Sequence, residues 1–382
     1  MSCGHGTVAL GLSGDLKPRA AECYPALVMV KIATALSGGV DSAVVAARLL
    51  AEGHDVVGLT ARLLPTDPAQ GKVCCNELMA AEICRLLGIS HHVVDLSQRF
   101  AEEVIGDFVR GYAAGLTPNP CLVCNAKVKF GALLDAAIDL GCDALATGHY
   151  AVREQRGERW GIRRGADTSK EQSYVLLDLT QAQLGRARLP LGDSLKCEVL
   201  QEARRLRLPL VAGESQDVCF IPPGIDYGEY LAQRLWVAPG PILDPTGRHL
   251  GRHRGLIFYT VGQRRGLGLG GGPRLYVLAK DPERNALIVG TQKELCRREF
   301  NVEKVNWVSV APPGEGEVVD CHVMVRYRGR LLKGQITVLA GRRCRVQVEL
   351  HTQAIAPGQG AAFYDDEGWL LGGGRIALDP VG

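Results

Sequence analysis

Cys121 and Cys124 form the pair of side chains in this sequence best suited to chemistry. They lie in the stretch TPNPCLVCNAKVKFG, residues 117–131, where two prolines and an asparagine precede a helical pattern. A Cys-x-x-Cys pair can be half of a zinc site, a redox couple, part of an iron–sulfur site, or an activated nucleophile with a helper thiol. Structural zinc usually needs a second Cys or His pair, and the adjacent Cys74 and Cys75 are poorly spaced for one. We therefore favour a functional thiol site.

The helix that carries these thiols could start at either of two places. With Asn119 as N-cap and Pro120 as the first helical residue, Cys121 and Cys124 would lie on one side of the first turns. A helix N-terminus lowers the pKa of a cysteine below its usual value of about 8.5 and so favours the reactive thiolate. A start at Asn125 would instead leave both cysteines in a loop. The sequence alone does not decide between the two.

A second chemical motif, SGGVDS at residues 37–42, lies between a predicted strand and a predicted helix. Backbone N–H groups and the positive end of the helix dipole can hold phosphate at such a turn. The Gly-Lys-Ser/Thr ending of a Walker A loop is missing, so no lysine here follows a transferred γ-phosphoryl group. The motif therefore favours a grip on pyrophosphate over a ligand-free glycine turn.

These motifs need a scaffold in which strands and helices alternate. The apolar patterns predict strands at 31–36, 55–63, 91–96 and 142–150, and helices at 43–53, 76–88, 98–115 and 126–141. Such alternation predicts an α/β fold with a doubly wound parallel sheet and ligands at the carboxyl ends of its strands. From residue 300 onward, short alternating segments predict antiparallel strands in a small barrel or sandwich.

We divide the chain into four parts by these patterns. The predicted division is a disordered extension or upstream start before Met29 (1–30), an ATP-binding catalytic domain (31–210), a small central linker domain (211–285) and a C-terminal β domain (286–382).

Composition limits the partners. The 382 residues carry a formal charge of only +3, so a nucleic-acid surface must come from local clusters. Two segments, 245–280 and 321–345, contain many Arg and Lys residues and no Asp or Glu, as expected for contacts with RNA phosphates. The thirteen cysteines are scattered, which favours a reducing cytoplasm, and no apolar run approaches the roughly 18 residues of a membrane span.

SGGVDS is the signature of the PP-loop ATP pyrophosphatases, which adenylate a carbonyl oxygen and release pyrophosphate. The chain further resembles one of their families, the bacterial-type tRNA-specific 2-thiouridylases, over roughly residues 31–380. These enzymes place sulfur on C2 of the wobble uridine, position 34 of tRNA. The motifs that carry the resemblance are TPNPxxxCNxxxKF at 117–130, ATGHYA at 146–151, KEQSYVL at 170–176, SQDVCFIP at 215–222, YTVGQRRGLGLGG at 259–271, VRYRG at 325–329 and APGQGAAFY at 356–364.

The resemblance implies a role for each matching residue. It makes Cys124 the nucleophile and Cys219, in the central domain, the carrier of persulfide sulfur, with Asn119, Pro120 and Cys121 beside the target base. It implies ATP contacts for Ala35, Leu36, Ser37, Gly38, Gly39, Val40, Asp41, Ser42, Ala61 and Gly148. It implies tRNA contacts for His149, Lys170, Glu171, Gln172, Arg326, Tyr327 and Gln359.

Cys121 departs from the pattern of the family, since many members carry an aspartate there. One hypothesis is that Cys121, Cys124 and Cys219 bind a [4Fe-4S] cluster with one iron open for sulfide. The other is direct transfer, in which the Cys219 persulfide delivers sulfur and Cys124 then forms a disulfide with Cys219. The sequence leaves both open.

The resemblance also implies ATP and Mg²⁺, the latter without a dedicated protein site. The expected partners are tRNAs of the Lys, Glu and Gln type and a sulfur donor such as a cysteine desulfurase or a relay protein, with no membrane. Two rival functions are kept: a PP-loop enzyme that acts on a small molecule, and a non-catalytic RNA-binding or iron–sulfur protein.

Overall fold

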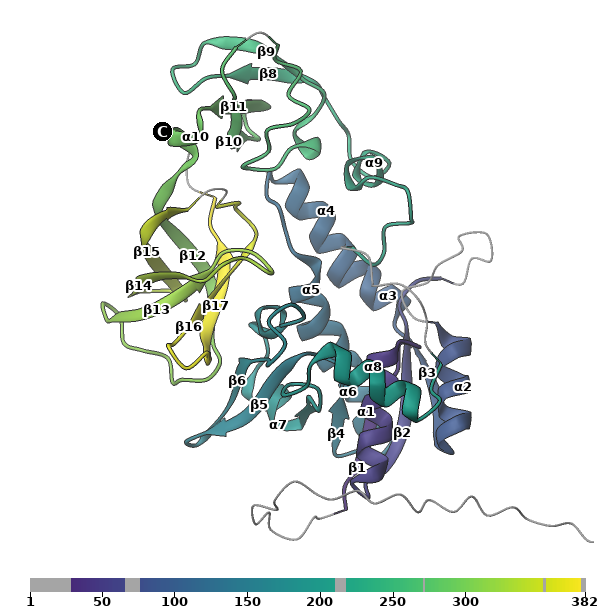
Figure 1. Cartoon of the computed structure of the whole chain (residues 1–382). Coiled ribbons are helices and arrows are strands. Elements are labelled where there is room, and N and C mark those ends of the chain that lie inside the picture. The colour runs from purple at the N-terminus through teal and green to yellow at the C-terminus, as the bar shows by residue number, and fades with distance from the viewer. Residues whose placement is uncertain (1–28, 66–75, 210–217, 271, 353–354, 379–382) are drawn as a thin grey trace, which may run out of the picture.

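The computed structural model describes residues 29–65, 76–209, 218–270, 272–352 and 355–378. Three bodies of secondary structure follow one another along the chain: an α/β domain, a small four-stranded sheet and a closed barrel (Figure 1). The predicted N-terminal extension before Met29 lies outside the described residues, as do Cys74 and Cys75.

The α/β domain is built on a five-stranded sheet of order β3-β2-β1-β4-β7. Its strands are β1 (Lys31–Ala35), β2 (Asp55–Arg62), β3 (Ser90–Asp95), β4 (Ala144–Ala146) and β7 (Ala187–Arg188). Every neighbouring pair runs parallel. The predicted parallel sheet is therefore confirmed.

Helices cover both faces of this sheet. Successive residues of a strand point to opposite faces, and in β1 and β2 they belong to two different cores. Ile32 and Val56 pack in a core with residues of α1 (Val40–Ala51), α2 (Glu77–Leu87) and α8 (Lys196–Arg205). Ala33 and Val57 pack in a second core with the helices between residues 97 and 139. The sheet is thus doubly wound, as predicted.

Helices α1 and α2 correspond to the helices predicted at 43–53 and 76–88, and capping residues mark their ends. The side chain of Asn76 caps α2 by accepting a hydrogen bond from the Met79 amide at 3.0 Å, and Gly88 ends it in the left-handed region at φ 70°. Gly53 follows α1 with φ 86°, which agrees with the glycine stop predicted there.

Two longer helical runs lie on the second face of the sheet. The first comprises α3 (Ser97–Phe100), a π-helical turn η1 (Ala101–Ile105) and α4 (Gly106–Ala113). The second comprises α5 (Pro120–Val123), a π-helical segment η2 (Cys124–Leu133) and α6 (Leu134–Asp139). We call the second run the cysteine helix. It starts at Pro120, so the first of the two predicted starts is correct.

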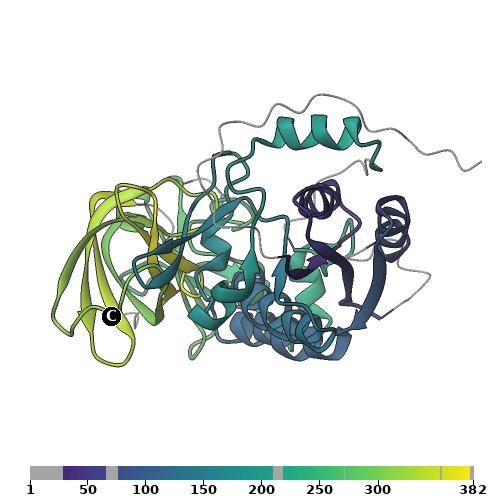
Figure 2. The same ribbon diagram turned by 90° about the horizontal axis from the view of Figure 1, so that it is seen from below.

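A hairpin and several short helices connect the α/β domain to the barrel. They are β5 (Ala151–Arg156), β6 (Arg159–Arg164), η3 (Ser173–Leu176) and α7 (Gln181–Arg186). The Ile162 amide donates to the Ser309 hydroxyl at 3.0 Å, and Asn306 donates to the carbonyls of Leu177 and Leu179. The barrel is therefore joined directly to the catalytic domain, on the far side from α1 (Figure 2).

The central region contains a mixed sheet of order β10-β11-β8-β9. Its elements are α9 (Tyr227–Ala232), β8 (Gly240–Leu243), β9 (His249–His253), η4 (Leu256–Phe258), β10 (Tyr276–Asp281), β11 (Ala286–Gly290) and the short α10 (Gln292–Leu295). The sequence did not predict these strands, because they are short and lie among many Gly and Pro residues.

The C-terminal strands close into a six-stranded antiparallel barrel of order β12-β15-β14-β13-β16-β17. They are β12 (Arg297–Trp307), β13 (Val318–Met324), β14 (Leu332–Leu339), β15 (Arg343–Thr352), β16 (Gly360–Tyr364) and β17 (Leu370–Ile376). Since β12 pairs with β17, the predicted choice between barrel and sandwich is decided for the barrel. None of the helices in the described residues is both long and apolar enough for a bilayer crossing.

Candidate nucleotide and thiol site

The SGGVDS loop follows β1 directly and leads into α1. Gly39 is the N-cap of α1 and offers no side chain to its amides, and the first intrahelical bond runs from the Ala43 amide to the Gly39 carbonyl at 3.2 Å. The amides that precede Ala43 in the first turn therefore have no acceptor within the helix. They point toward the loop side at the positive end of the dipole, which is the arrangement that binds phosphate.

The shape of this loop is fixed by its own side chains and by α2. Ser42 donates to the Gly39 carbonyl at 2.9 Å, and the Asn76 amide donates to the Ser37 carbonyl at 2.9 Å. Gly38 has φ 79°, and a Cβ there would lie 2.7 Å from the Asn76 carbonyl oxygen. Only glycine suits that position, because the conformation and the space both exclude a side chain.

Gly148 lies against the start of α1 from the end of β4. A Cβ at this position would be 3.0 Å from Asp41 Cβ and 3.3 Å from the Ser42 amide nitrogen. The structure thus brings Gly148 to the SGGVDS loop, although more than a hundred residues separate them in sequence.

Asp41 receives two donors from distant parts of the chain. Lys196 Nζ, at the start of α8, lies 2.5 Å from Asp41 Oδ1, and the Tyr150 hydroxyl donates to the same oxygen at 2.8 Å. Sequence reasoning found no lysine for this loop, and the fold supplies one from outside the motif. No local signal could have revealed Lys196, since it meets the loop only through the packing of α8 on α1.

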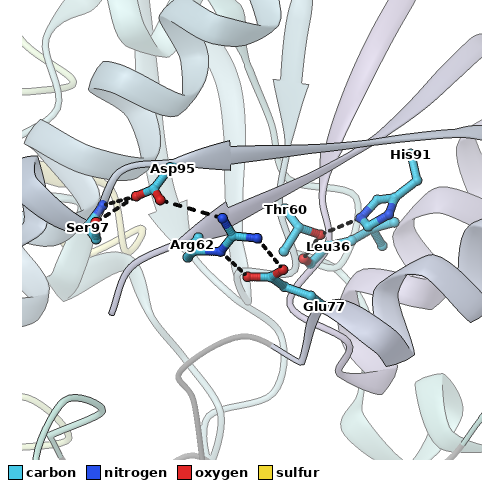
Figure 3. A network of polar contacts seen from close by, with 7 residues as sticks. All are labelled: Leu36, Thr60, Arg62, Glu77, His91, Asp95 and Ser97. Carbon is cyan, nitrogen blue, oxygen red and sulfur yellow. Dashed lines mark hydrogen bonds and ion pairs between the residues drawn. The ribbon is translucent and has the colours of Figure 1, made fainter. Parts of the chain in front are cut away.

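Ala61 lies near the carboxyl end of β2, buried beside a polar network that Figure 3 shows. There Thr60 donates its hydroxyl to the Leu36 carbonyl and contacts His91 Nε2, both at 2.9 Å. Because the hydroxyl has one hydrogen, His91 donates from Nε2 to Thr60. Arg62 makes a two-bond pair with Glu77 at 2.9 Å, which holds α2 to the strand ends around the loop.

The cysteine helix begins with the cap that the sequence suggested. Asn119 Oδ1 accepts from the Cys121 amide at 3.0 Å, and Pro120 occupies the first helical position. Cys121 is exposed, whereas Cys124 is 8% exposed and belongs to the core. All cysteines in the described part of the chain are unbridged, Cys124 and Cys219 included.

The thiols are less acidic than predicted. Burial raises the pKa of Cys124 to about 12, and the charge of Lys129 offsets only part of that rise. Desolvation raises the pKa of Cys121 as well, and the charge of Lys129 again opposes that rise. The prediction of a lowered pKa is therefore wrong for this state, because the loss of water around the thiol outweighs the helix terminus.

Cys219 lies close enough to act on both other thiols. It raises the pKa of Cys121 and of Cys124, as a nearby ionisable group does. The structure thus brings Cys219, which is half-buried, to the cysteine helix from almost a hundred residues away.

Lys129 is a charged neighbour that sequence reasoning missed. In an α-helix it would lie about 140° around the axis from Cys124, because five residues turn the helix by about 500°. The segment from Cys124 to Leu133 is π-helical with a kink at Gly131 (φ −102°, ψ −106°), and the wider turns before that kink bring residues five apart toward the same side. Lys129 accordingly lowers the pKa of Cys121, Cys124 and His149.

His149 joins the nucleotide loop to the cysteine helix. It directly follows Gly148, and its ring lies 6.0 Å from that of Phe130. Its Nδ1 is 2.8 Å from the Thr147 hydroxyl, and burial together with the charge of Lys129 holds its pKa well below 6.5. The ring is therefore neutral and enclosed at neutral pH.

The segment 170–172 was predicted to contact tRNA. Each of its three residues also makes hydrogen bonds within the protein. Gln172 exchanges hydrogen bonds with the backbone of Tyr150, at 3.0 Å through its side chain and 2.9 Å through its amide. Glu171 is buried, accepts from the Ser173 amide at 2.6 Å and lies 3.7 Å from Arg164. Lys170 donates its amide to the Asp167 carbonyl and is half-buried. Glu171 is thus accounted for by structure alone, while Gln172 braces the residue that holds Asp41.

Two of the barrel residues predicted to contact tRNA touch the catalytic domain, Gln359 before the cysteine helix and Tyr327 beside η3. Gln359 donates to the Thr117 carbonyl at 2.8 Å, two residues before Asn119. The ring of Tyr327 lies 6.1 Å from that of Tyr174, and Arg326 beside it is exposed. The barrel therefore reaches the start of the cysteine helix directly.

Comparisons with known proteins agree with this arrangement along the whole chain. Three family models match in order: "tRNA methyl transferase HUP domain" at 30–223, "tRNA methyl transferase PRC-barrel domain" at 228–291 and "Aminomethyltransferase beta-barrel domain" at 297–376. The tRNA-specific 2-thiouridylase MnmA of Chloroflexus aggregans is 46% identical over 93% of this chain and 100% of its own length. That of Moorella thermoacetica is 43% identical over 90% of this chain and 98% of its own.

The chain belongs to the tRNA-specific 2-thiouridylase family.

Solved structures add little to the family assignment. The U34-tRNA thiolase NcsA from Methanococcus maripaludis, solved with its [4Fe-4S] cluster, is 21% identical over 48% of this chain and 58% of its own, with a TM-score of 0.31. A likeness this low carries no argument about a cluster in this 2-thiouridylase.

The cluster hypothesis can be tested on the side chains of this family member. Within the described ranges, no three His, Cys, Asp or Glu side chains are grouped as ligands for a metal ion. That finding concerns a single metal ion, whereas Cys121, Cys124 and Cys219 are near enough for the charge of Cys219 to affect the pKa of the other two.

Proposed function

We propose that this chain uses ATP to replace the C2 oxygen of the tRNA wobble uridine with sulfur. The observation that carries the proposal is the bridge at residues 148 and 149. Gly148 packs against Asp41 of the nucleotide loop, and the next residue, His149, packs against Phe130 of the cysteine helix. A base activated at the loop would therefore lie within reach of the thiols.

The first step is adenylation. The C2 oxygen attacks the α-phosphorus of ATP, and the bond to pyrophosphate breaks with its electron pair on the pyrophosphate. The free amides at the start of α1 and the ammonium of Lys196 are the groups that hold the departing charge. Mg²⁺ is usually held by one or two carboxylates together with substrate phosphates, and Asp41 is the carboxylate placed to do so; the ion would supply further charge neutralisation.

The second step is sulfur transfer through the two cysteines. The outer sulfur of a Cys219 persulfide attacks C2, and AMP leaves with the electrons of the C–O bond. The Cys124 thiolate then attacks Cys219 Sγ, and the S–S bond breaks toward the sulfur on C2, which becomes the thiocarbonyl. The product enzyme holds a Cys124–Cys219 disulfide, which an external thiol reductant must reduce before the next cycle.

We favour this direct route over a cluster because two cysteines suffice for it, and Cys219 lies near enough to Cys124 to raise its pKa. Cys121 then serves beside the base with Asn119 and Pro120, in the place where many relatives have an aspartate.

The partners follow from the same chemistry. The persulfide sulfur must come from a donor such as a cysteine desulfurase or a relay protein, in a compartment that keeps thiols reduced, and we take this to be the cytoplasm. The tRNA substrates would be those of the Lys, Glu and Gln type. Arg326, Tyr327, Gln359, Lys170 and Gln172 would contact them, together with exposed arginines of 245–280, whereas Glu171 is buried and would support its neighbours.

The test is incubation of the iron-free enzyme with ATP, unmodified tRNA and a persulfide donor. We expect one AMP for each 2-thiouridine formed, and no thiolation with Cys124→Ser or Cys219→Ser, although both variants still bind ATP. AMP release from a small molecule without tRNA would favour the first rival function. An iron-free enzyme that is inactive and regains thiolation only after iron–sulfur reconstitution would overturn the direct route.

A further inference from the structure

Lys280 is buried, although its place in a basic segment of the sequence suggests an exposed side chain. It ends the basic segment 245–280, which the sequence assigned to contacts with RNA, yet it is only 2% exposed. It lies on β10 of the central sheet, with Nζ 5.4 Å from the ring of Tyr112 in α4. That part of the RNA prediction is therefore wrong for this residue, because Lys280 points into the protein.

Burial of this amine is costly. It lowers the pKa of Lys280 to about 7, and no charged group in the described part of the chain offsets the effect. A methionine would fill similar space without losing hydration. A polar group kept at such a position indicates a specific contact, since natural sequences break local rules mainly where function requires it.

The contact is with the loop that leads into the cysteine helix. Lys280 Nζ donates to the Leu116 carbonyl at 3.0 Å, three residues before the cap Asn119. An amine donates this bond whether it is charged or neutral. Lys280 therefore ties the central sheet to the entry of the thiol site.

The same loop is held on its other sides as well. A Cβ on Gly115, which has φ 75°, would lie 2.6 Å from Pro282 of the central region. The Thr117 amide donates to the Pro357 carbonyl at 2.7 Å, and Gln359 reaches the Thr117 carbonyl. The central sheet and the barrel thus clamp three consecutive residues just before the cysteine helix starts.

We propose that Lys280 is a positioning residue for sulfur transfer, which fixes the start of the cysteine helix relative to the central sheet by holding the Leu116 carbonyl. The inference rests on the proposed function for its consequence, but the clamp itself is a property of the free protein. A tRNA that docks on the central region and the barrel would then find the thiols already held at a fixed position relative to both.

The experiment compares Lys280→Met with Lys293→Met, an exposed lysine of the same region, in the full chain. Hydrogen exchange of backbone amides is measured first, without ATP or tRNA. Loss of the bond should make the amides of residues 116–124 exchange about tenfold faster, with no change in α1 or in β8–β11. Lys280→Arg, which keeps a donor, should restore most of the protection. Lys293→Met should match the parent.

Single-turnover thiolation is measured second. Lys280→Met should slow sulfur transfer about tenfold while the Kd for ATP stays unchanged. If Lys280→Met does not fold, Lys280→Leu serves instead, because it also removes the donor to the Leu116 carbonyl. Parent-like exchange at 116–124 in the variant that folds would overturn the proposal. Faster exchange in a protein that never thiolates tRNA would support the clamp and refute the proposed function.

Discussion

In the resting enzyme, Cys124 should be almost entirely protonated. The charge of Lys129 is the influence that lowers its pKa and so favours the reactive thiolate. With the pKa of Cys124 at about 12, only about one molecule in ten thousand carries the thiolate at pH 8. A free cysteine, with a pKa of about 8.5, would be roughly one quarter ionised at that pH. Alkylation of Cys124 should therefore be about a thousandfold slower than alkylation of a free cysteine.

Replacing Lys129 by Met should slow this reaction further. The charge of Lys129 lowers the pKa of Cys124, and each pKa unit lost with that charge would reduce the thiolate about tenfold. Lys127→Met is the matched control, since Lys127 is exposed on the same helix and no shift of Cys124 is attributed to it. Lys129→Arg should preserve most of the rate.

Iodoacetamide labelling from pH 7 to pH 10, read by mass spectrometry of the 117–127 region, measures these rates. Limited access of the reagent lowers the alkylation rate equally at every pH. A raised pKa instead moves the pH at which the rate levels off to a higher value, so the two causes of slow labelling are separable. We expect the rate at Cys124 to rise about tenfold per pH unit with no plateau below pH 10. A plateau near pH 8 or 9, or a Lys129→Met variant with the parental rate, would refute the reasoning.

Four further outcomes follow from the site and the fold. Gly148→Ala should weaken ATP binding at least about tenfold, because its Cβ would meet Asp41 at 3.0 Å, whereas Gly272→Ala, with nothing within 4 Å, should bind as the parent does in calorimetric titration. Lys196→Met should raise the Kd for ATP about tenfold or more in the same assay, and an unchanged value would remove Lys196 from the phosphate site. The free energy of unfolding should fall as pH rises above about 8.5, by about 1.4 kcal/mol per pH unit for each thiol that ionises only in the unfolded chain, and a flat profile in urea melts would contradict this. The thiols concerned are Cys84, Cys124, Cys321 and Cys344. Affinity for tRNA should drop steeply between low and moderate salt, and a flat response would count against phosphate contacts.

Much of the catalytic domain could be predicted because its signals are local. The turn after β1, the helix ends at Gly53 and Gly88 and the cap at Asn119 each depend on a few neighbouring residues. The contacts of Lys196 with Asp41 and of Lys280 with Leu116 could not be predicted, since they depend on how distant elements pack.

Two features of the thiol site were missed for a different reason. The π-helical winding that turns Lys129 toward Cys124 has no known mark in the residue pattern. The direction of the pKa shift of Cys124 depends on how much water the folded chain removes from around the thiol. Desolvation raises this pKa, whereas the helix terminus suggested that it would be lowered. Burial of one side chain is a tertiary property, so spacing alone could not supply it.

Direct sulfur transfer through Cys124 and Cys219 is tested most directly by the state of the two cysteines after one round of catalysis. The persulfide-loaded enzyme is mixed with ATP and tRNA, without reductant and free of iron, and its peptides are analysed by mass spectrometry. We expect one Cys124–Cys219 disulfide for each 2-thiouridine formed. Full thiolation with both cysteines still unbridged would contradict it.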